Sequence, residues 1–105
     1  MRILFDQGTP LPLRGHLTDH SIDTAFELGW SNLQNGDLLD ACERDGYQLL
    51  VSTDQNLKYQ QKISDRSLSF IILLSTSWPR IVLRVDDVKA AIGRVSPGEY
   101  IEIPI

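Results

Sequence analysis

The stretch LSFIILL, residues 68–74, is apolar at every position except Ser69. A continuous apolar run of this length is typical of a strand that is covered on both faces, whereas a strand with one face in water alternates. Such strands occur mainly in parallel sheets that have helices on either side. The stretch therefore predicts an α/β fold with a buried strand at residues 68–74.

Strand and helix patterns alternate on both sides of this stretch, which favours a parallel or mostly parallel sheet. We therefore expect one domain over residues 1–105, a three-layer α/β/α arrangement with a mostly parallel sheet of four to five strands. The further strands are predicted over residues 2–5, 21–26, 48–52 and 99–103. The helices are predicted from Pro10 (after a cap at Thr9) to about Asp19, from Asn35 or Gly36 to Arg44, from Asn56 to about Ile63, and from a cap at Ser77 to Val95.

The composition fits a globular chain of 105 residues, with 42% hydrophobic residues and a net charge of −4. This charge argues against a protein that coats nucleic acid by bulk attraction. It leaves a metal-dependent nuclease open, since a metal site is itself acidic. The chain has one cysteine and no apolar run long enough for a signal peptide or a membrane span, so we expect a cytoplasmic protein.

Three aspartates are expected at one edge of the predicted sheet. Asp6 ends the first strand, Asp54 follows the third, and Asp37 lies in the first turn of the helix after the second. The carboxyl ends of parallel strands and the beginnings of the following helices share one edge, where open α/β sheets bind ligands. Three carboxylates there would repel one another unless a hard divalent cation such as Mg²⁺ or Mn²⁺ neutralised them.

Each aspartate also has a purely structural interpretation. Asp37 is a favourable first-turn residue for the helix dipole, and Asp6 and Asp54 are ordinary turn formers after strands. The case for a metal site rests on the coincidence of all three at one edge.

Three motifs give the chain a resemblance to a known family. They are ILFDQGTP at residues 3–10, FELGW followed by NGDLLDA at residues 26–30 and 35–41, and LLVSTDQNL at residues 49–57. In order and spacing they resemble the small PIN-like domains, relatives of the VapC-type toxins. The resemblance covers nearly the whole chain.

The resemblance implies a PIN-like fold and a divalent-metal-dependent ribonuclease, a hydrolase of phosphodiester bonds that uses Mg²⁺ or Mn²⁺. It also implies the toxin half of a toxin–antitoxin pair, with RNA as substrate and an antitoxin protein as partner. Asp6, Asp37 and Asp54 match the acidic positions that are catalytic and ligate the metal, and Glu27 stands where a further acid is sometimes found. A homodimer is a separate expectation, because so small a sheet leaves apolar surface to cover.

The chain departs from the family pattern in ways that leave a second function open. Gln7 stands where Glu is usual, Asn56 where a second Asp is usual, and Leu57 where an aromatic residue is usual. Asn56 could still offer a metal a carbonyl oxygen, without charge, and Gln7 is a possible additional site residue. The alternative is therefore a catalytically degenerate PIN-like binding module that acts through a protein partner. A phosphoacceptor domain of receiver type also gathers acids at strand ends, but no lysine follows the fourth strand.

Several other polar residues could assist at this edge or serve structure alone. Thr53 could orient a carboxylate or a water, or simply end a strand. For a substrate phosphate the weaker candidates are Arg14, Ser75, Ser77 and Arg80, each of which has an ordinary capping or surface alternative. Trp30 could stack on a base or be structural. His16 and His20 have metal-ligand spacing but no supporting motif, and Cys42 is expected in the core.

Overall fold

An all-parallel sheet runs through the middle of the molecule. The computed structural model describes residues 1–60 and 62–105, and its five strands lie in the order β2-β1-β3-β4-β5. The strands are β1 (Arg2–Phe5), β2 (Ser21–Thr24), β3 (Leu49–Ser52), β4 (Ser69–Leu73) and β5 (Tyr100–Ile103). All five residues of β4 are buried, which confirms the strand predicted from its apolar run. The fold is therefore α/β with every neighbouring strand pair parallel.

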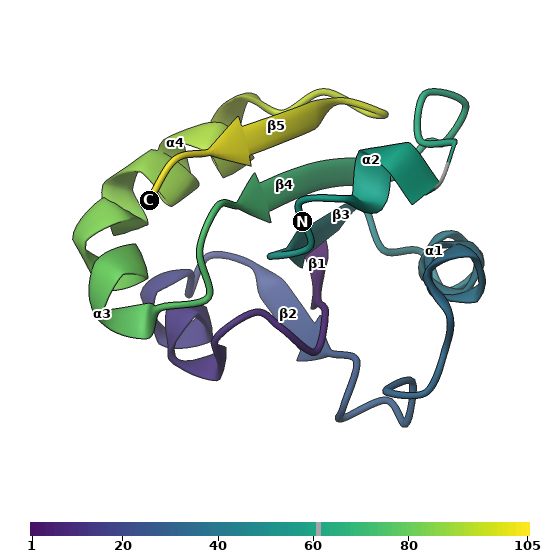
Figure 1. The fold of residues 1–105 in the computed structure, drawn as a ribbon, viewed down its shortest axis with the longest axis horizontal. Coiled ribbons are helices and arrows are strands. Elements are labelled where there is room, and N and C mark those ends of the chain that lie inside the picture. Colours follow the sequence, from purple (N-terminus) through teal and green to yellow (C-terminus); the bar gives the residue numbers. More distant parts are fainter. Residues whose placement is uncertain (61) are drawn as a thin grey trace.

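Helices cover both faces of the sheet, as Figure 1 shows. The helical segments are η1 (Leu11–His16), α1 (Asn35–Arg44), α2 (Leu57–Gln60), α3 (Trp78–Ile81), η2 (Val82–Arg84) and α4 (Val85–Arg94). Side chains of η1, α3 and α4 pack with Ile3, Phe5 and Val51 on one face. Side chains of α1 and α2 pack with Leu4 and Leu50 on the other. Among residues 1–60 and 62–105 no helix has both the length and the apolar character needed to cross a membrane.

The helix α1 ends as its sequence predicts. Gly46 has a positive φ of 82°, which glycine adopts without strain. The amide of Gly46 donates to the carbonyl of Glu43, and the amide of Tyr47 donates to that of Cys42. This pair of bonds is the Schellman motif, and it satisfies carbonyls that the end of the helix would otherwise leave unpaired.

Three predicted helices differ from the observed ones. The helix predicted from Asn56 to about Ile63 is observed as α2, which ends at Gln60; residue 61 lies outside the described residues, and residues 62 and 63 are not helical. Thr9 does not cap the first helix, because its amide and hydroxyl both bind the Asp6 carboxylate. The segment that follows is a 3₁₀ helix of six residues with Pro10 at its N-cap. The helix predicted from Ser77 to Val95 is three consecutive segments, and its backbone leaves helical geometry at Arg84 (φ −116°, ψ 17°). Its apolar stripe nevertheless faces the core from Ile81 onward.

Candidate functional site

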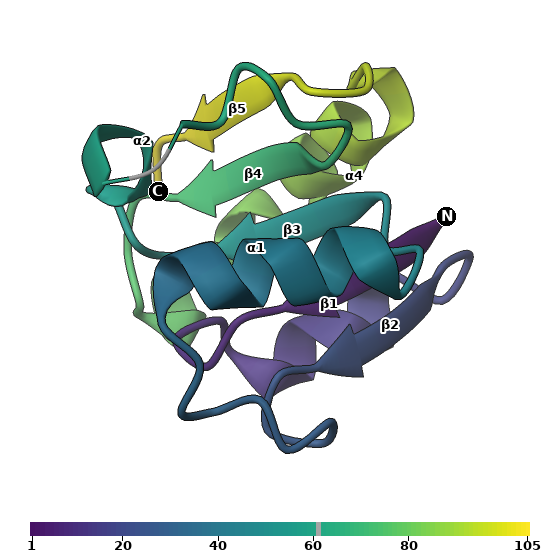
Figure 2. The same cartoon turned by 90° about the vertical axis from the view of Figure 1, so that its right-hand side faces the viewer.

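The strand order creates a switch point between β1 and β3. From β1 the chain moves to β2 on one side, and after α1 it returns to β3 on the other. Figure 2 shows α1 lying across β1 and β3. In open α/β sheets a crevice forms outside the carboxyl ends of the strands at such a point and binds ligands. Asp6 directly follows β1, and Asp54 lies two residues beyond β3.

The Asp6 carboxylate is held by two hydroxyl-bearing residues. The amide of Thr9 donates to Asp6 Oδ1 at 3.1 Å, and the Thr9 hydroxyl lies 2.8 Å from the same oxygen. The hydroxyl of Ser52 donates to the other oxygen, Asp6 Oδ2. This contact follows from the strand register, because Phe5 pairs with Val51 and so sets Asp6 beside Ser52.

Ser52 also links the Asp6 carboxylate to the backbone of Asp54. Its hydroxyl oxygen accepts a hydrogen bond from the backbone amide of Asp54 at 3.0 Å. The hydroxyl proton points to Asp6 and the oxygen accepts from Asp54, so one buried side chain orders both acidic segments. Ser52 had no role in the prediction from sequence, because a serine that ends an apolar strand carries no distinguishing signal.

Asn35, at the beginning of α1, joins the site from the third side. Its side-chain amide nitrogen donates to Asp54 Oδ2 at 3.3 Å and to Gln60 Oε1 at 2.8 Å. An ionised carboxylate only accepts hydrogen bonds, so the atom of Asn35 that faces Asp54 is its nitrogen. The sequence does hold a signal for Asn35, since it shares the helix face of Leu38, Leu39 and Cys42 at spacings of three, four and seven.

Asp37 does not join this group. Its side chain is exposed and makes no hydrogen bond or ion pair within the described part of the chain. Asp37 follows Asn35 by two residues, a rotation of about 200° around a helix with 3.6 residues per turn. Asn35 faces Asp54, so Asp37 lies on the far side of α1. The structure brings together two of the three predicted aspartates.

Burial raises the pKa of the Asp6 carboxyl, and the hydrogen bonds from Ser52 and Thr9 act in the opposite direction. Desolvation favours the neutral form of a carboxyl group. A nearby cation opposes this effect, because it stabilises the charged form. A cation bound near Asp6 would therefore stabilise its charged form. A structural ion-pair partner for it is absent among residues 1–60 and 62–105.

The donor set decides which cation could fit. Across residues 1–60 and 62–105, no group of three or more His, Cys, Asp or Glu side chains could hold a metal ion. Zn²⁺ sites of three or four such side chains are thereby not supported. Mg²⁺ makes smaller demands on a protein, since it keeps several waters and takes one or two carboxylates together with substrate phosphates. Asp6 and Asp54, as two carboxylate donors, fit that smaller requirement.

Three further candidates lie beside these carboxylates. Gln7 is exposed and lines a cavity with Asp6 and Asn35. A Cβ atom on Gly8 would lie 2.5 Å from the Thr53 hydroxyl oxygen, so Thr53 packs tightly against the loop that follows β1. The backbone amide of Asn56 donates to Asp54 Oδ1 at 2.9 Å, and its side chain is exposed. All three positions thus border the site predicted from the sequence.

Glu27 and Arg14 bind each other. Their side chains form an ion pair at 2.7 Å, and Glu27 also accepts from the amide of Thr24 at 3.1 Å. The hydrogen bond from Arg14 lowers the pKa of Glu27, and the same bond raises the pKa of Arg14. This exposed pair fastens η1 to the segment after β2, which is a structural role for both residues.

The phosphate candidates after β4 have structural partners as well. The Ser75 hydroxyl accepts from the amide of Ser77 at 3.0 Å, and Ser77 makes no side-chain cap bond to α3. Arg80 is exposed and donates to the carbonyl of Ile105 at 3.4 Å. The helix α3 has four residues, too few for a strong anion site at its N-terminus.

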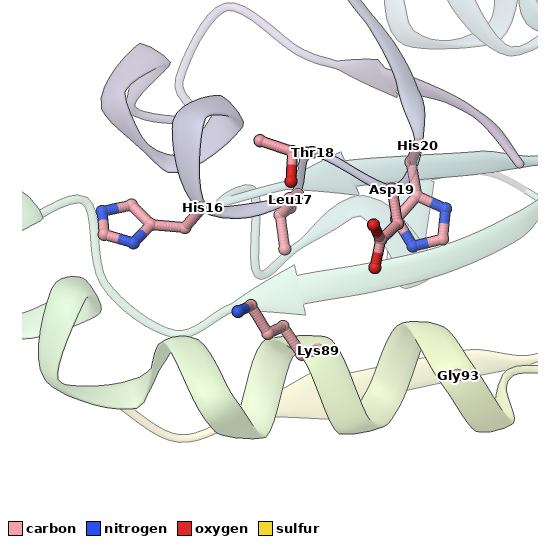
Figure 3. Close-up of a pocket in the computed structure, with 7 residues that line it drawn as sticks. All are labelled: His16, Leu17, Thr18, Asp19, His20, Lys89 and Gly93. Atoms are coloured by element: carbon pink, nitrogen blue, oxygen red, sulfur yellow. The ribbon is translucent and has the colours of Figure 1, made fainter.

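The two histidines do not form a metal pair. They line a separate cavity of about 290 Å³ between the segment before β2 and α4. Figure 3 shows the His16 and His20 rings pointing away from each other. The His16 ring packs against Trp78 with a centroid separation of 5.6 Å. Cys42 is buried, and burial raises the pKa of its thiol to about 12, which suits a core residue and not a nucleophile.

We predict that Ser52→Ala lowers the free energy of unfolding by about 1–3 kcal/mol near pH 7, because one oxygen of the half-buried Asp6 carboxylate and the backbone amide of Asp54 both lose their Ser52 partner. The pKa of Asp6 should rise further, since the Ser52 hydroxyl holds it down. The loss of stability should therefore shrink in acid, where Asp6 becomes neutral. Urea unfolding at both pH values, with the exposed Ser96→Ala as control, measures this. An equal loss at both pH values would show that Ser52 acts through Asp54 alone.

Comparisons with protein-family models, with curated proteins and with solved structures found no match to this chain.

Proposed function

We propose that this protein is a metal-dependent ribonuclease of PIN-like type, with its site at the switch point between β1 and β3. The observation that carries the proposal is that Ser52 binds both the carboxylate of Asp6 and the backbone amide of Asp54, which places both aspartates at the ligand-binding edge of a parallel sheet. Acidic oxygen ligands at such an edge suit Mg²⁺ or Mn²⁺. The resemblance of the three sequence motifs to PIN-like domains supplies the substrate class, RNA.

Each residue of the site has a distinct task in this proposal. Asp6 and Asp54 hold the cation, which when bound stabilises phosphate charge and lowers the pKa of a water. Ser52 and Thr9 fix the rotamer of Asp6, and the side-chain amide of Asn35 orients Asp54. Fixed ligands of this kind reduce the reorganisation that the reaction would otherwise require.

The same resemblance supports a biological setting. The protein would be the toxin component of a toxin–antitoxin pair, with an antitoxin protein as partner and a homodimer as its own assembly. Exposed apolar side chains near the site could serve such contacts: the loop after β2 presents Phe26, Leu28 and Leu33 to solvent.

The proposal is tested by titrating metal-free protein with Mn²⁺ in a calorimeter and by assaying cleavage of a mixed-sequence single-stranded RNA. We expect one Mn²⁺ site per chain and cleavage that EDTA abolishes. The double variant Asp6→Asn/Asp54→Asn, purified identically, controls for contaminating ribonuclease. If the wild type neither binds Mn²⁺ nor cleaves RNA, the proposed ribonuclease activity is wrong.

A second function is favoured by a specific feature of the same site. The hydroxyls and amides around Asp6 and Asp54 already satisfy much of their hydrogen-bonding capacity, and the neighbouring Gln7 and Asn56 carry no charge. A PIN-like module without catalysis, acting through a protein partner, would have this character. Mn²⁺ affinity in the range of active metal sites would count against it.

A further inference from the structure

A small cavity opens directly beside Asp6. It has a volume of about 140 Å³ and lies between the end of β1, the loop after β2 and the beginning of α1. Its polar lining comes from Asp6, Gln7, Ser31 and Asn35, and Trp30 contributes an aromatic wall. At ~30 Å³ per liquid water the volume equals that of about five waters. This is room for one flat heterocyclic ring and not for two.

The polar groups whose hydrogen-bonding role is fixed are acceptors. The side-chain amide nitrogen of Asn35 already donates to Asp54 and Gln60, so the carbonyl oxygen of Asn35 remains available to accept a hydrogen bond. The Asp6 carboxylate, when ionised, can only accept. A ligand that fills the cavity must therefore supply donors. A ligand that placed an acceptor atom beside the Asp6 carboxylate and the Asn35 carbonyl oxygen would lose its hydrogen bonds to water and form none in their place.

Ser31 is the adaptable member of the lining. Its hydroxyl oxygen is covered from solvent and has no hydrogen-bond partner in the described part of the chain. A covered hydroxyl without a partner is unfavourable, and rotation about χ1 costs little between staggered positions. A ring in the cavity would allow Ser31 to turn toward it and donate to a ring nitrogen or carbonyl.

We propose that this cavity binds one unpaired cytosine base of the RNA, seated beside Asp6. The inference rests on the proposed ribonuclease function for the identity of the polymer. Cytosine is a single ring whose exocyclic amino group donates two hydrogen bonds, as the Asp6 and Asn35 acceptors require. Uracil has the same size but presents a carbonyl at that position. Trp30 gives the ring an apolar surface.

The test uses nucleosides, which carry no phosphate and need no metal. Cytidine and uridine are titrated separately into ¹⁵N-labelled, metal-free protein, and the backbone amide and Trp30 indole resonances are followed by NMR. We expect cytidine to bind at least about fivefold more tightly than uridine, with shifts confined to the cavity. Ser31→Ala should weaken cytidine binding about fivefold, and Ser96→Ala, which removes an exposed hydroxyl elsewhere, should not.

The outcomes separate this proposal from the ribonuclease itself. Equal binding of the two nucleosides, no binding of either, or shifts outside the cavity would overturn the cytosine site, even if RNA is cleaved. Preferential cytidine binding by a protein that cleaves no RNA would support the base site and would contradict the proposed ribonuclease activity. Binding of arginine amide in the cavity, with no cytidine binding, would overturn the base and indicate a basic side chain of a protein partner.

Discussion

Asp6→Asn is expected to lower the rate of RNA cleavage by about 10³-fold or more while leaving the protein as stable as the wild type, or more so. The loss of activity follows from removing the charge that would hold the cation. Asn retains the shape of Asp and keeps one oxygen for Thr9. Its nitrogen can donate to the Ser52 oxygen, which reverses the direction of that hydrogen bond and preserves the contact.

The stability of this variant follows from the raised pKa of Asp6. Because burial raises that pKa, the folded protein holds the proton to a higher pH than the unfolded chain does. Between the two values the folded state binds more protons, so the free energy of unfolding falls as the pH rises. Near pH 7 the wild type therefore bears the cost of a half-buried charge, which the neutral amide of Asn avoids.

Chemical unfolding as a function of pH measures this prediction beside the cleavage assay. The stability advantage of Asp6→Asn should be present near pH 7 and should disappear in acid, once Asp6 of the wild type is protonated. Residues that cost stability but are needed for function are typical of active sites. A variant that is both inactive and markedly less stable near pH 7 would instead assign Asp6 a structural role.

The sequence predicts the sheet well because its signals are local. The apolar run of β4, the glycine that ends α1 and the alternation of elements each depend on neighbouring residues, and all are found. Strand β1 has the predicted bounds, the other four strands extend one or two residues less than predicted, and β2 ends at Thr24 instead of Phe26. Phe26 is 77% exposed, so its apolar character gave no information about pairing.

The sequence predicts the site less well because side-chain contacts are not local. Topology alone places Asp6 and Asp54 at one edge, and this holds in the structure. The link through Ser52 depends on the register of β1 against β3, which no local pattern specifies. Thr9 had the sequence of a helix cap, but a carboxylate three residues earlier competes for the same amide and hydroxyl. The sequence places Asp37 at the predicted site because it lies in the first turn of α1, but the residues of that turn face different directions.

Because Asp37 and Asn35 face different directions on α1, a second large effect is expected. Asp54→Asn should reduce RNA cleavage by about 10²–10³-fold, whereas Asp37→Asn should change it by no more than about twofold. Asp54 faces the site, where Asn35 and Ser52 order it. Asp37 lies about 200° around α1 from Asn35 and faces solvent.

The two variants form a matched pair because their expected costs in stability are similar. In Asp54→Asn one new amide faces the amide of Asn35, and the lost hydrogen bond should cost about 1 kcal/mol. In Asp37→Asn a first-turn charge is lost, at a cost of about 0.3–1 kcal/mol from the helix dipole. A large difference in kcat/KM between two nearly equally stable proteins would thus report on the site itself. Equal losses of activity and of Mn²⁺ affinity in the two variants would restore Asp37 to the ligand set that the sequence predicted, and would require α1 to turn when metal binds.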